Sequence, residues 1–280
     1  MRAVFKYPGS KWSIASWIID HFPVHHSYLE PFFGSGAVLF HKPKSKIETV
    51  NDLDKDVVNF FECVRSDPDG MTHEINHTPY SRYIYEQAVE RIKSKEEWLI
   101  PDPSRAVMFA AKMTMGFSFR TNEVKVGFKR DIQGREAAYA ANDWCKLPER
   151  FEDIIDRLRG VQIENRPAVQ LIREFNYPNV LIYADPPYVL SSRSCKRGQY
   201  KFEMTDEDHE ELLDTLLKHK GPVVISGYQS SLYESRLKEW RQDCVEYRTQ
   251  RAGRSQEVIW MNYDPPYIQG DVFDVMEGVI

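Results

Sequence analysis

Val180-Leu-Ile-Tyr-Ala-Asp-Pro-Pro-Tyr188 is the stretch of this 280-residue sequence that decides the fold. Its first five residues form a continuous apolar run, which is typical of a strand buried on both faces of a parallel sheet. The acid and the two prolines then end the strand, because proline fixes φ and lacks a backbone N–H. Similar strand patterns, each followed by a helical pattern, occupy residues 27–30, 46–50, 161–163 and 223–225. This alternation predicts an α/β fold built on a parallel sheet.

The alternation stops between residues 66 and 150. There the sequence predicts helices over residues 80–94 and 104–115 and a β-hairpin that turns at Thr121-Asn122. The alternation then resumes, with helices expected from Ala168, over 206–219 and over 233–240, and with further strands near Val245 and over 258–261. We therefore predict one α/β domain, formed by residues 1–65 and 151–280, that a mostly helical insertion at residues 66–150 interrupts.

The composition is that of an ordinary globular protein, with 42% hydrophobic and 28% charged residues. Disorder as the main state is excluded, because enough aromatic and aliphatic residues are present to bury a core. No apolar run approaches the roughly 20 residues that span a bilayer, and the N-terminus lacks the apolar stretch of a secretory signal. The four cysteines form no Cys-x-x-Cys pair, so neither a metal site nor a disulfide framework is predicted. We expect a soluble, cytoplasmic protein.

The net charge of −5 argues weakly against a nucleic-acid partner, but the basic residues are clustered. Such clusters fit a phosphate-binding face, although solvated surface explains many basic runs equally well. The first cluster comprises Arg105, Lys112, Arg120, Lys125, Lys129, Arg130 and Arg135, and the second comprises Arg193, Lys196, Arg197 and Lys201. The acidic run 203–214 is interpreted as the solvated start of a helix, with His209 at an exposed position.

The segment Glu30-Pro-Phe-Phe-Gly-Ser-Gly36 ends the first predicted strand. Its glycines allow a sharp turn and a close approach to a ligand, at the strand end where α/β folds bind nucleotides. A dinucleotide fingerprint would need a third glycine where Leu39 stands, which disfavours a nicotinamide-dependent oxidoreductase. Asp52 follows the next strand, 16 residues beyond Gly36, and is placed either to accept hydrogen bonds from ribose hydroxyls or simply to cap the helix after it.

The segment Asp185-Pro-Pro-Tyr188 places two acceptors side by side, the carboxylate of Asp185 and the carbonyl of Pro186. This pair suits a planar NH2 group, and the ring of Tyr188 offers a face on which a base can stack. The combination fits the exocyclic amine of a nucleobase that has been taken out of the duplex. The same tetrapeptide recurs at Asp264–Tyr267, where no basic loop or helix follows it, and we interpret this second copy as a turn without a chemical role.

Five motifs, in this order along the chain, resemble those of the Dam-type (D12 class) DNA adenine-N6 methyltransferases: Lys6-Tyr-Pro-Gly-Ser-Lys11, Glu30–Gly36, Asn51-Asp-Leu-Asp54, Asp185–Tyr188 and Glu257-Val-Ile-Trp260. The resemblance covers nearly the whole chain. It implies a class I, Rossmann-like, S-adenosyl-L-methionine-dependent methyltransferase fold whose insertion recognises the target sequence. It also implies a site-specific enzyme that flips adenine out of double-stranded DNA and methylates N6 by direct in-line transfer, without a metal.

The family's functional residues have counterparts at matching positions of this chain. The resemblance implies cofactor contacts by Tyr7, Lys11, Glu30, Phe32, Gly34, Gly36, Asp52 and Asp185. It implies a catalytic group of Asp185, Pro186, Pro187 and Tyr188. For DNA contacts we name the basic and polar residues of the two clusters, Arg120, Asn122, Lys125, Lys129, Arg130, Arg193, Lys196 and Arg197.

Two departures from the family's pattern limit the transfer. Asn165 stands where the family often has a phenylalanine against the cofactor's adenine, and the stretch 115–122 differs from the hairpin of GATC-methylating enzymes. Methylation of cytosine N4, methylation of adenine in RNA and a catalytically silent DNA-binding module stay open as alternatives. The resemblance further implies a bacterial or phage-encoded monomer, a cognate restriction endonuclease as a partner, and no membrane association.

Overall fold

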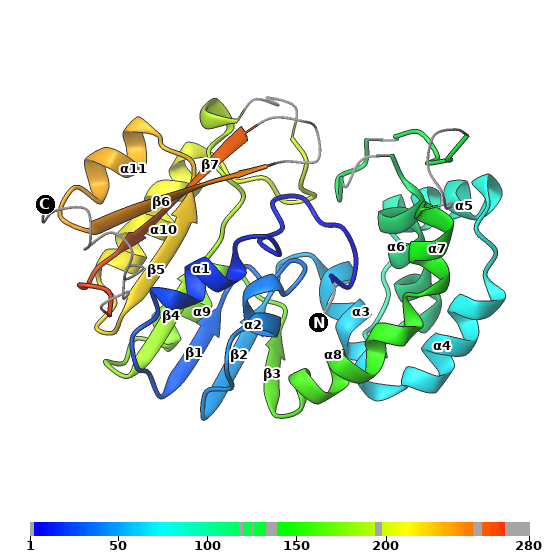
Figure 1. The fold of residues 1–280 in the computed structure, drawn as a ribbon, viewed down its shortest axis with the longest axis horizontal. Helices are drawn as coiled ribbons and strands as arrows, with labels where there is room; N and C mark the ends of the chain where they lie inside the picture. Colours follow the sequence, from blue (N-terminus) through cyan, green and yellow to red (C-terminus); the bar gives the residue numbers. More distant parts are fainter. Residues whose placement is uncertain are drawn as a thin grey trace, which may run out of the picture.

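The computed structural model describes residues 3–117, 120–124, 126–132, 139–193, 198–248 and 254–266 (Figure 1). A seven-stranded sheet with the order β3-β2-β1-β4-β5-β7-β6 forms its centre. The strands are β1 (Ser27–Glu30), β2 (Ile47–Asn51), β3 (Val161–Glu164), β4 (Val180–Ala184), β5 (Val223–Gly227), β6 (Arg241–Arg248) and β7 (Arg254–Met261). In these described ranges no helix combines the length and the apolar character needed to cross a membrane.

Strand direction decides which loops meet. Strands β1 to β5 are all parallel, whereas β7 runs antiparallel to both β5 and β6. In the register of β5 and β7, Val258 lies opposite Gly227 at the end of β5, and Met261 at the end of β7 lies opposite Val224. The parallel strands therefore all end at one edge, which we call the carboxyl edge, and β7 ends at the opposite edge. This arrangement confirms the predicted Rossmann-like methyltransferase fold.

Helices cover both faces of the sheet, which explains why the central strands are apolar throughout. Alternate residues of a strand point to opposite faces, so Tyr28 packs on one side and Leu29 on the other. The first face is covered by α1 (Ala15–Asp20), α2 (Ala37–His41) and α3 (Lys55–Ser66). The second is covered by α9 (Ala168–Glu174), α10 (Asp206–Leu217) and α11 (Ser231–Arg236). The last of these stops at Arg236, so our prediction of a helix to Trp240 was wrong.

Residues 66–158 form a helical group beside the sheet (Figure 1). It contains α4 (Pro68–His77), α5 (Arg82–Lys93), α6 (Pro103–Met115), α7 (Tyr139–Cys145), a short 3-10 turn (Pro148–Arg150) and α8 (Phe151–Leu158). Apolar side chains of α6 pack against α3 and α5, and they join the core on the first face of the sheet. Asp67, Ser81 and Asp102 cap the N-termini of α4, α5 and α6. The sequence analysis found α5 and α6 but missed α4, α7 and α8.

The predicted hairpin is formed only at its base among the described residues. Gly116 and Phe128 make an isolated antiparallel bridge. Beyond this bridge, the N–H groups of Thr121 and Asn122 both donate to the carbonyl of Gln199, at 2.9 and 3.4 Å. The buried ammonium of Lys112 donates to the carbonyls of the same two residues, which holds the turn against α6. The turn is thus paired with another loop and with a lysine.

Candidate active site

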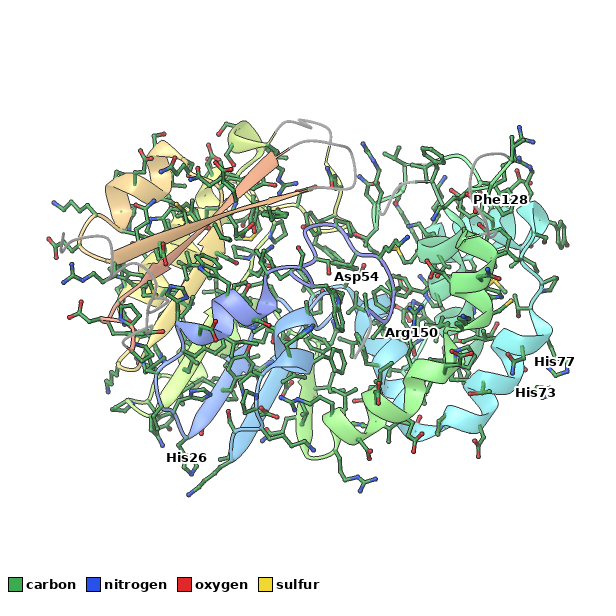
Figure 2. All side chains as sticks on the ribbon, viewed as in Figure 1. His26, Asp54, His73, His77, Phe128 and Arg150 are labelled. Atoms are coloured by element: carbon green, nitrogen blue, oxygen red, sulfur yellow. The ribbon has the colours of Figure 1, made fainter. Side chains whose placement is uncertain are left out.

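A cavity of about 270 Å³ opens at the carboxyl edge of the sheet. Figure 2 labels Asp54, one of the residues that line it, at the centre of the molecule between the sheet and the helical group. The lining comes from the N-terminal segment (Tyr7–Lys11), the ends of β1 and β2, the loop before α9, the residues after β4 and the segment Tyr200–Met204. Loops that are far apart in the sequence meet here because the parallel strands end at the same edge.

The glycine turn after β1 forms one wall of the cavity. Gly34 and Gly36 have φ values of 50° and 70°, in the left-handed region that favours glycine. A Cβ on Gly34 would come within 2.9 Å of the ring of Tyr7, and a Cβ on Gly36 within 2.4 Å of Phe40. The turn therefore requires glycine both for its backbone conformation and for space. Gly34 lines the cavity, whereas Gly36 lies beneath it as the N-cap of α2.

The other residues named as cofactor contacts also line the cavity: Tyr7, Lys11, Glu30, Phe32, Asp52 and Asp185. Two of them are carboxyls with raised pKa values. Burial raises the pKa of Glu30 to about 8, although the hydroxyl of Tyr28 donates to it. Burial and the neighbouring Asp54 raise the pKa of Asp52 to about 7, although it accepts the backbone N–H groups of Gly34 and Asp54. The cavity therefore favours a positively charged ligand.

Lys11 joins the cavity to the residues after β4. Its ammonium is buried 2.9 Å from Oδ2 of Asp185 and 3.7 Å from Oε1 of Glu257, and it donates to the carbonyl of Gly9 at 2.6 Å. Burial alone would lower the pKa of this lysine, but the two carboxylates outweigh it and raise the pKa above its ordinary value. Asp185 also accepts the hydroxyl of Ser226 at 3.0 Å. The carboxylate at the end of β4 is thus held from two sides.

Tyr188 contacts Lys11 but is not among the residues that line the cavity. Its hydroxyl donates to Oε1 of Glu257, the ammonium of Lys11 lies 4.9 Å from its ring centroid, and Tyr228 packs edge-on at 4.7 Å. Pro186 is buried, and Pro187 lines the cavity. The four residues named as catalytic therefore lie together at the carboxyl edge, next to the cavity.

The segment 198–203 contributes four residues to the lining of the cavity, Tyr200, Lys201, Phe202 and Glu203. The hydroxyl of Tyr200 donates to the carbonyl of Pro8 at 3.1 Å. The ammonium of Lys201 pairs with Asp56 at 2.8 Å and with Asp54 at 3.3 Å. Its backbone N–H donates to Oγ1 of Thr121, which belongs to the loop after α6. The sequence places Lys201 in a basic cluster, and no local pattern predicts its ion pairs with Asp54 and Asp56.

The residues named as DNA contacts have different positions. Arg120 and Asn122 donate to the carbonyl of Gly198 from the loop after α6, and Lys129 and Arg130 follow the bridge at Phe128. Arg193 is buried and pairs with Glu203 at 2.9 Å, beside the ring of Tyr200. The other three, Lys125, Lys196 and Arg197, lie outside the described residues.

The structure corrects three assignments of exposed charge. Arg105 and Lys112 were counted in a basic phosphate-binding face, but both are buried. Arg105 pairs with Asp56, and Lys112 binds backbone carbonyls, where burial lowers its pKa to about 8. His209 was expected at an exposed position, but it is buried against Tyr233, and burial lowers its pKa to about 4. A charged residue type therefore does not by itself place a side chain on the surface.

Two further sequence features have clear places. Asn165 donates to the carbonyls of Asp52 and Leu53, so it shapes the loop after β2. Asp264, which begins the second Asp-Pro-Pro-Tyr copy, lies beyond the end of β7 and pairs with Arg241 at 2.5 Å on the surface. Tyr267 of that copy lies outside the described residues. Among the residues that the structure describes, no three His, Cys, Asp or Glu side chains gather as a metal site requires.

Comparison with known proteins identifies relatives across most of the chain. The model of a protein family described as D12 class N6 adenine-specific DNA methyltransferase matches residues 7–253. The Type II methyltransferase M.MjaIII of Methanocaldococcus jannaschii is 22% identical over 233 residues, which cover 74% of this chain and 76% of that protein. The family match runs from Tyr7 through the glycine turn and the Asp185–Tyr188 segment, so it includes the whole cavity.

Proposed function

Because the chain belongs to the D12 class of N6 adenine-specific DNA methyltransferases, we propose that its cavity binds S-adenosylmethionine and that Asp185–Tyr188 receive the target adenine. The enzyme transfers a methyl group to N6 of adenine in DNA. The observation that carries the proposal is the position of Asp185, which lines the cavity and also begins the segment suited to the target amine. One carboxylate thus lies where donor and acceptor have to meet.

The chemistry of the cavity fits S-adenosylmethionine. Seven acidic residues and two lysines line it. S-adenosylmethionine carries a sulfonium and an ammonium against one carboxylate, so this excess of negative charge favours it over an anionic dinucleotide. Asp52, which follows β2, would accept hydrogen bonds from the ribose hydroxyls, and Glu30 would contact the methionine part. Tyr7, Lys11, Phe32 and Gly34 would complete its contacts.

The acceptor site follows from the chemistry of the amine. The N6 lone pair of adenine is delocalised into the ring, so N6 is a poor nucleophile. Hydrogen bonds from N6 to the Asp185 carboxylate and the Pro186 carbonyl favour a pyramidal nitrogen whose lone pair is free, and Pro187 keeps this segment stiff. The bound cofactor supplies an electrophilic methyl group. The Asp185–Tyr188 segment would orient N6 toward that methyl, whose bond to sulfur would break as the bond to N6 forms, and Asp185 or water would then take the N6 proton.

The proposed DNA face lies at the same carboxyl edge. An adenine inside a duplex is out of reach of a carboxylate that lines a cavity, so the base has to be flipped out, and Tyr188 offers it a stacking surface. We propose that residues 66–150 recognise double-stranded DNA through the loop that contains Arg120, Asn122, Lys129 and Arg130. Phe117 beside this loop is 71% exposed, so its ring is accessible to a partner on this side.

Two proposals concern the enzyme's partners. The likeness to a Type II methyltransferase supports a role beside a restriction endonuclease of the same specificity. We also propose that the enzyme acts as a monomer on its DNA. Sedimentation with and without a target duplex tests the second proposal, because a dimer would double the mass of the free protein.

The test of the proposed function is methyl transfer from labelled S-adenosylmethionine to unmethylated genomic DNA, followed by nucleoside analysis and mapping of the modified positions. We expect N6-methyladenine at one short recurring sequence, and binding of S-adenosylmethionine but not of a nicotinamide dinucleotide in calorimetry. Label in N4-methylcytosine, or transfer to RNA alone, would contradict the proposed acceptor. Cofactor binding without any transfer would indicate a silent DNA-binding module.

A further inference from the structure

Glu257 belongs to the motif Glu257-Val-Ile-Trp260, to which the proposed function gives no role. It precedes Val258, which lies opposite Gly227 at the end of β5. Because β7 is antiparallel to β5, this part of β7 lies at the carboxyl edge, where Asp185 also lies. Side chains alternate along a strand, so Glu257 shares with Ile259 the face of the sheet that α1 covers. This geometry directs its carboxylate toward Lys11.

The burial of Glu257 is costly for a purely structural residue. Its side chain is 0% exposed, and among the described residues Oε1 accepts the hydroxyl of Tyr188 and lies 3.7 Å from the ammonium of Lys11. Among the described residues Oε2 has no hydrogen-bond partner. A buried carboxylate that is only half satisfied stabilises a fold less well than a neutral side chain of the same size. The charge at this position therefore needs a reason other than stability.

Glu257 contacts Tyr188 and also Lys11, the lysine that binds Asp185, although it does not line the cavity. On one side it accepts the hydroxyl of Tyr188, whose ring is further held by Lys11 on its face and Tyr228 at its edge. On the other side it lies 3.7 Å from the ammonium that also binds Asp185. With both carboxylates ionised, the charge of Lys11 is divided between them. Asp185 then keeps acceptor strength for a further hydrogen bond.

We propose that Glu257 is a positioning residue of the methyl-transfer site, which fixes the ring of Tyr188 and draws part of the charge of Lys11 away from Asp185. The ring is thereby held ready to stack on the flipped base, and the Asp185 carboxylate remains able to accept the target amine. This inference rests on the proposed function, since Tyr188 and Asp185 have their roles there.

The proposal includes a pH dependence that a structural role would lack. The charged and titratable groups around the carboxyl are Lys11, Tyr183, Asp185, Tyr188, Tyr228 and Tyr247. Burial raises the pKa of Glu257 to about 7, although Lys11 opposes this. When Glu257 is protonated, the charge of Lys11 is paired with Asp185 alone, and Asp185 becomes a weaker acceptor for the target amine. The kcat of the wild type should therefore rise as the pH rises through about 7. In Glu257→Gln this rise should be absent.

A double-mutant cycle tests the coupling, with Glu257→Gln, Tyr188→Phe and the double variant. Each protein is assayed for kcat, for KM on the mapped target duplex and for the Kd of S-adenosylmethionine. We expect Glu257→Gln to lower kcat about 30-fold and to change the cofactor Kd less than about 3-fold. The kcat of the double variant should be no lower than that of the less active single variant, because both changes remove the same contact. Glu234→Gln, at an exposed position of α11, is the control that should match the wild type.

Several outcomes would overturn the inference: wild-type kcat in Glu257→Gln, multiplicative losses in the double variant, or an unchanged pH profile. If Glu257→Gln fails to fold, Tyr188→Phe and the wild-type pH profile still test the inference. It requires that Tyr188→Phe lowers kcat and that the kcat of the wild type rises with pH. Asp185→Ala distinguishes a failure of the proposed function from a failure of this inference. Activity in that variant contradicts the proposed function itself, whereas an inactive Asp185→Ala beside a fully active Glu257→Gln contradicts this inference alone.

Discussion

Two copies of one tetrapeptide, Asp-Pro-Pro-Tyr, lie at opposite edges of the same sheet. The copy that begins at Asp185 follows β4, a parallel strand, and its acid is 19% exposed with the ammonium of Lys11 at 2.9 Å. The copy that begins at Asp264 follows β7, which runs in the opposite direction, and its acid is 78% exposed beside Arg241. The direction of the preceding strand, rather than the four residues, decides which copy lies next to the cavity.

The comparison shows what a short motif contributes and what it does not. Both copies contain the same stiff pair of prolines and the same acid, so their local chemistry is equal. They differ in what lies around them, because Lys11, Ser226 and Glu257 come together only at the carboxyl edge. A motif is therefore a hypothesis about function until its structural context is known.

The largest expected difference is in activity when each acid is removed. Asp185→Ala removes the acceptor for the target amine, and kcat should fall by at least about 1,000-fold. Asp264→Ala loses one surface ion pair and should keep wild-type kcat and KM. Methyl transfer to the mapped duplex measures both. Loss of activity in Asp264→Ala with activity retained in Asp185→Ala would reverse the assignment of the two copies.

Removing the cation beside each acid should also cost more stability at the copy that begins at Asp185 than at the copy that begins at Asp264. Lys11→Met leaves the buried Glu257 and the partly buried Asp185 without their cation, and the free energy of unfolding should fall by about 3 kcal/mol. Arg241→Met breaks only the surface pair with Asp264, and the change should stay below about 0.5 kcal/mol. Urea unfolding of the free protein at pH 7.5 measures both values. Equal losses would mean that the buried cluster is no more than another ion pair.

How much of this could be predicted from the sequence depends on the range of each interaction. The apolar run before Asp185 predicts its strand because periodicity is a local property. The reversal of β7 and the meeting of Lys11 with Glu257 are set by topology, which no local pattern contains. The family resemblance supplied the list of cofactor residues, and most of these line the cavity.

One error was avoidable. His209 is three, four and seven residues before Leu212, Leu213 and Leu216, so it lies on the apolar face of α10. The spacing predicts burial, but the acidic neighbours of His209 suggested an exposed position. The burial of Lys112 could not have been foreseen in this way, because its partners are the carbonyls of Thr121 and Asn122 in a loop without regular structure.

The two edges should also differ in how charge affects stability. The pKa of Glu30 is raised to about 8 in the folded protein, so the folded state binds this proton more tightly than the unfolded chain does. The free energy of unfolding therefore falls as the pH rises from about 4.5 to about 8. Glu30→Gln does not titrate, and its stability relative to the wild type should grow across that window, by on the order of 2 kcal/mol.

Thermal unfolding of the ligand-free proteins between pH 5 and pH 8.5 measures this difference. The control is Asp264→Asn at the opposite edge, which removes an exposed carboxyl beside Arg241 and should change the free energy of unfolding by less than about 0.5 kcal/mol. A constant difference for Glu30→Gln would show that the cavity tolerates the charged carboxylate without cost. It would also weaken the argument that an excess of negative charge selects a cationic cofactor.

The smallest expected effect concerns DNA, and it tests whether the carboxyl edge is also the DNA face. Figure 2 shows Phe128 on the side toward which the parallel strands point and His26 on the opposite side. Arg130 is exposed two residues after Phe128, and Lys46 is exposed just before β2, at the opposite edge. Arg130→Gln should raise KM for DNA about 3-fold and lower the salt slope of binding by about one, with kcat unchanged, because one phosphate contact is lost.

Lys46→Gln is the matched control, since it removes the same charge from the edge that the second tetrapeptide copy shares. Fluorescence anisotropy of a labelled target duplex, measured over a series of salt concentrations, compares the two variants under identical conditions. We expect only Arg130→Gln to differ from the wild type. If Lys46→Gln weakened binding instead, DNA would approach the edge that lacks the cavity, and a flipped adenine could not reach Asp185. The two edges would then no longer divide into a functional one and a structural one.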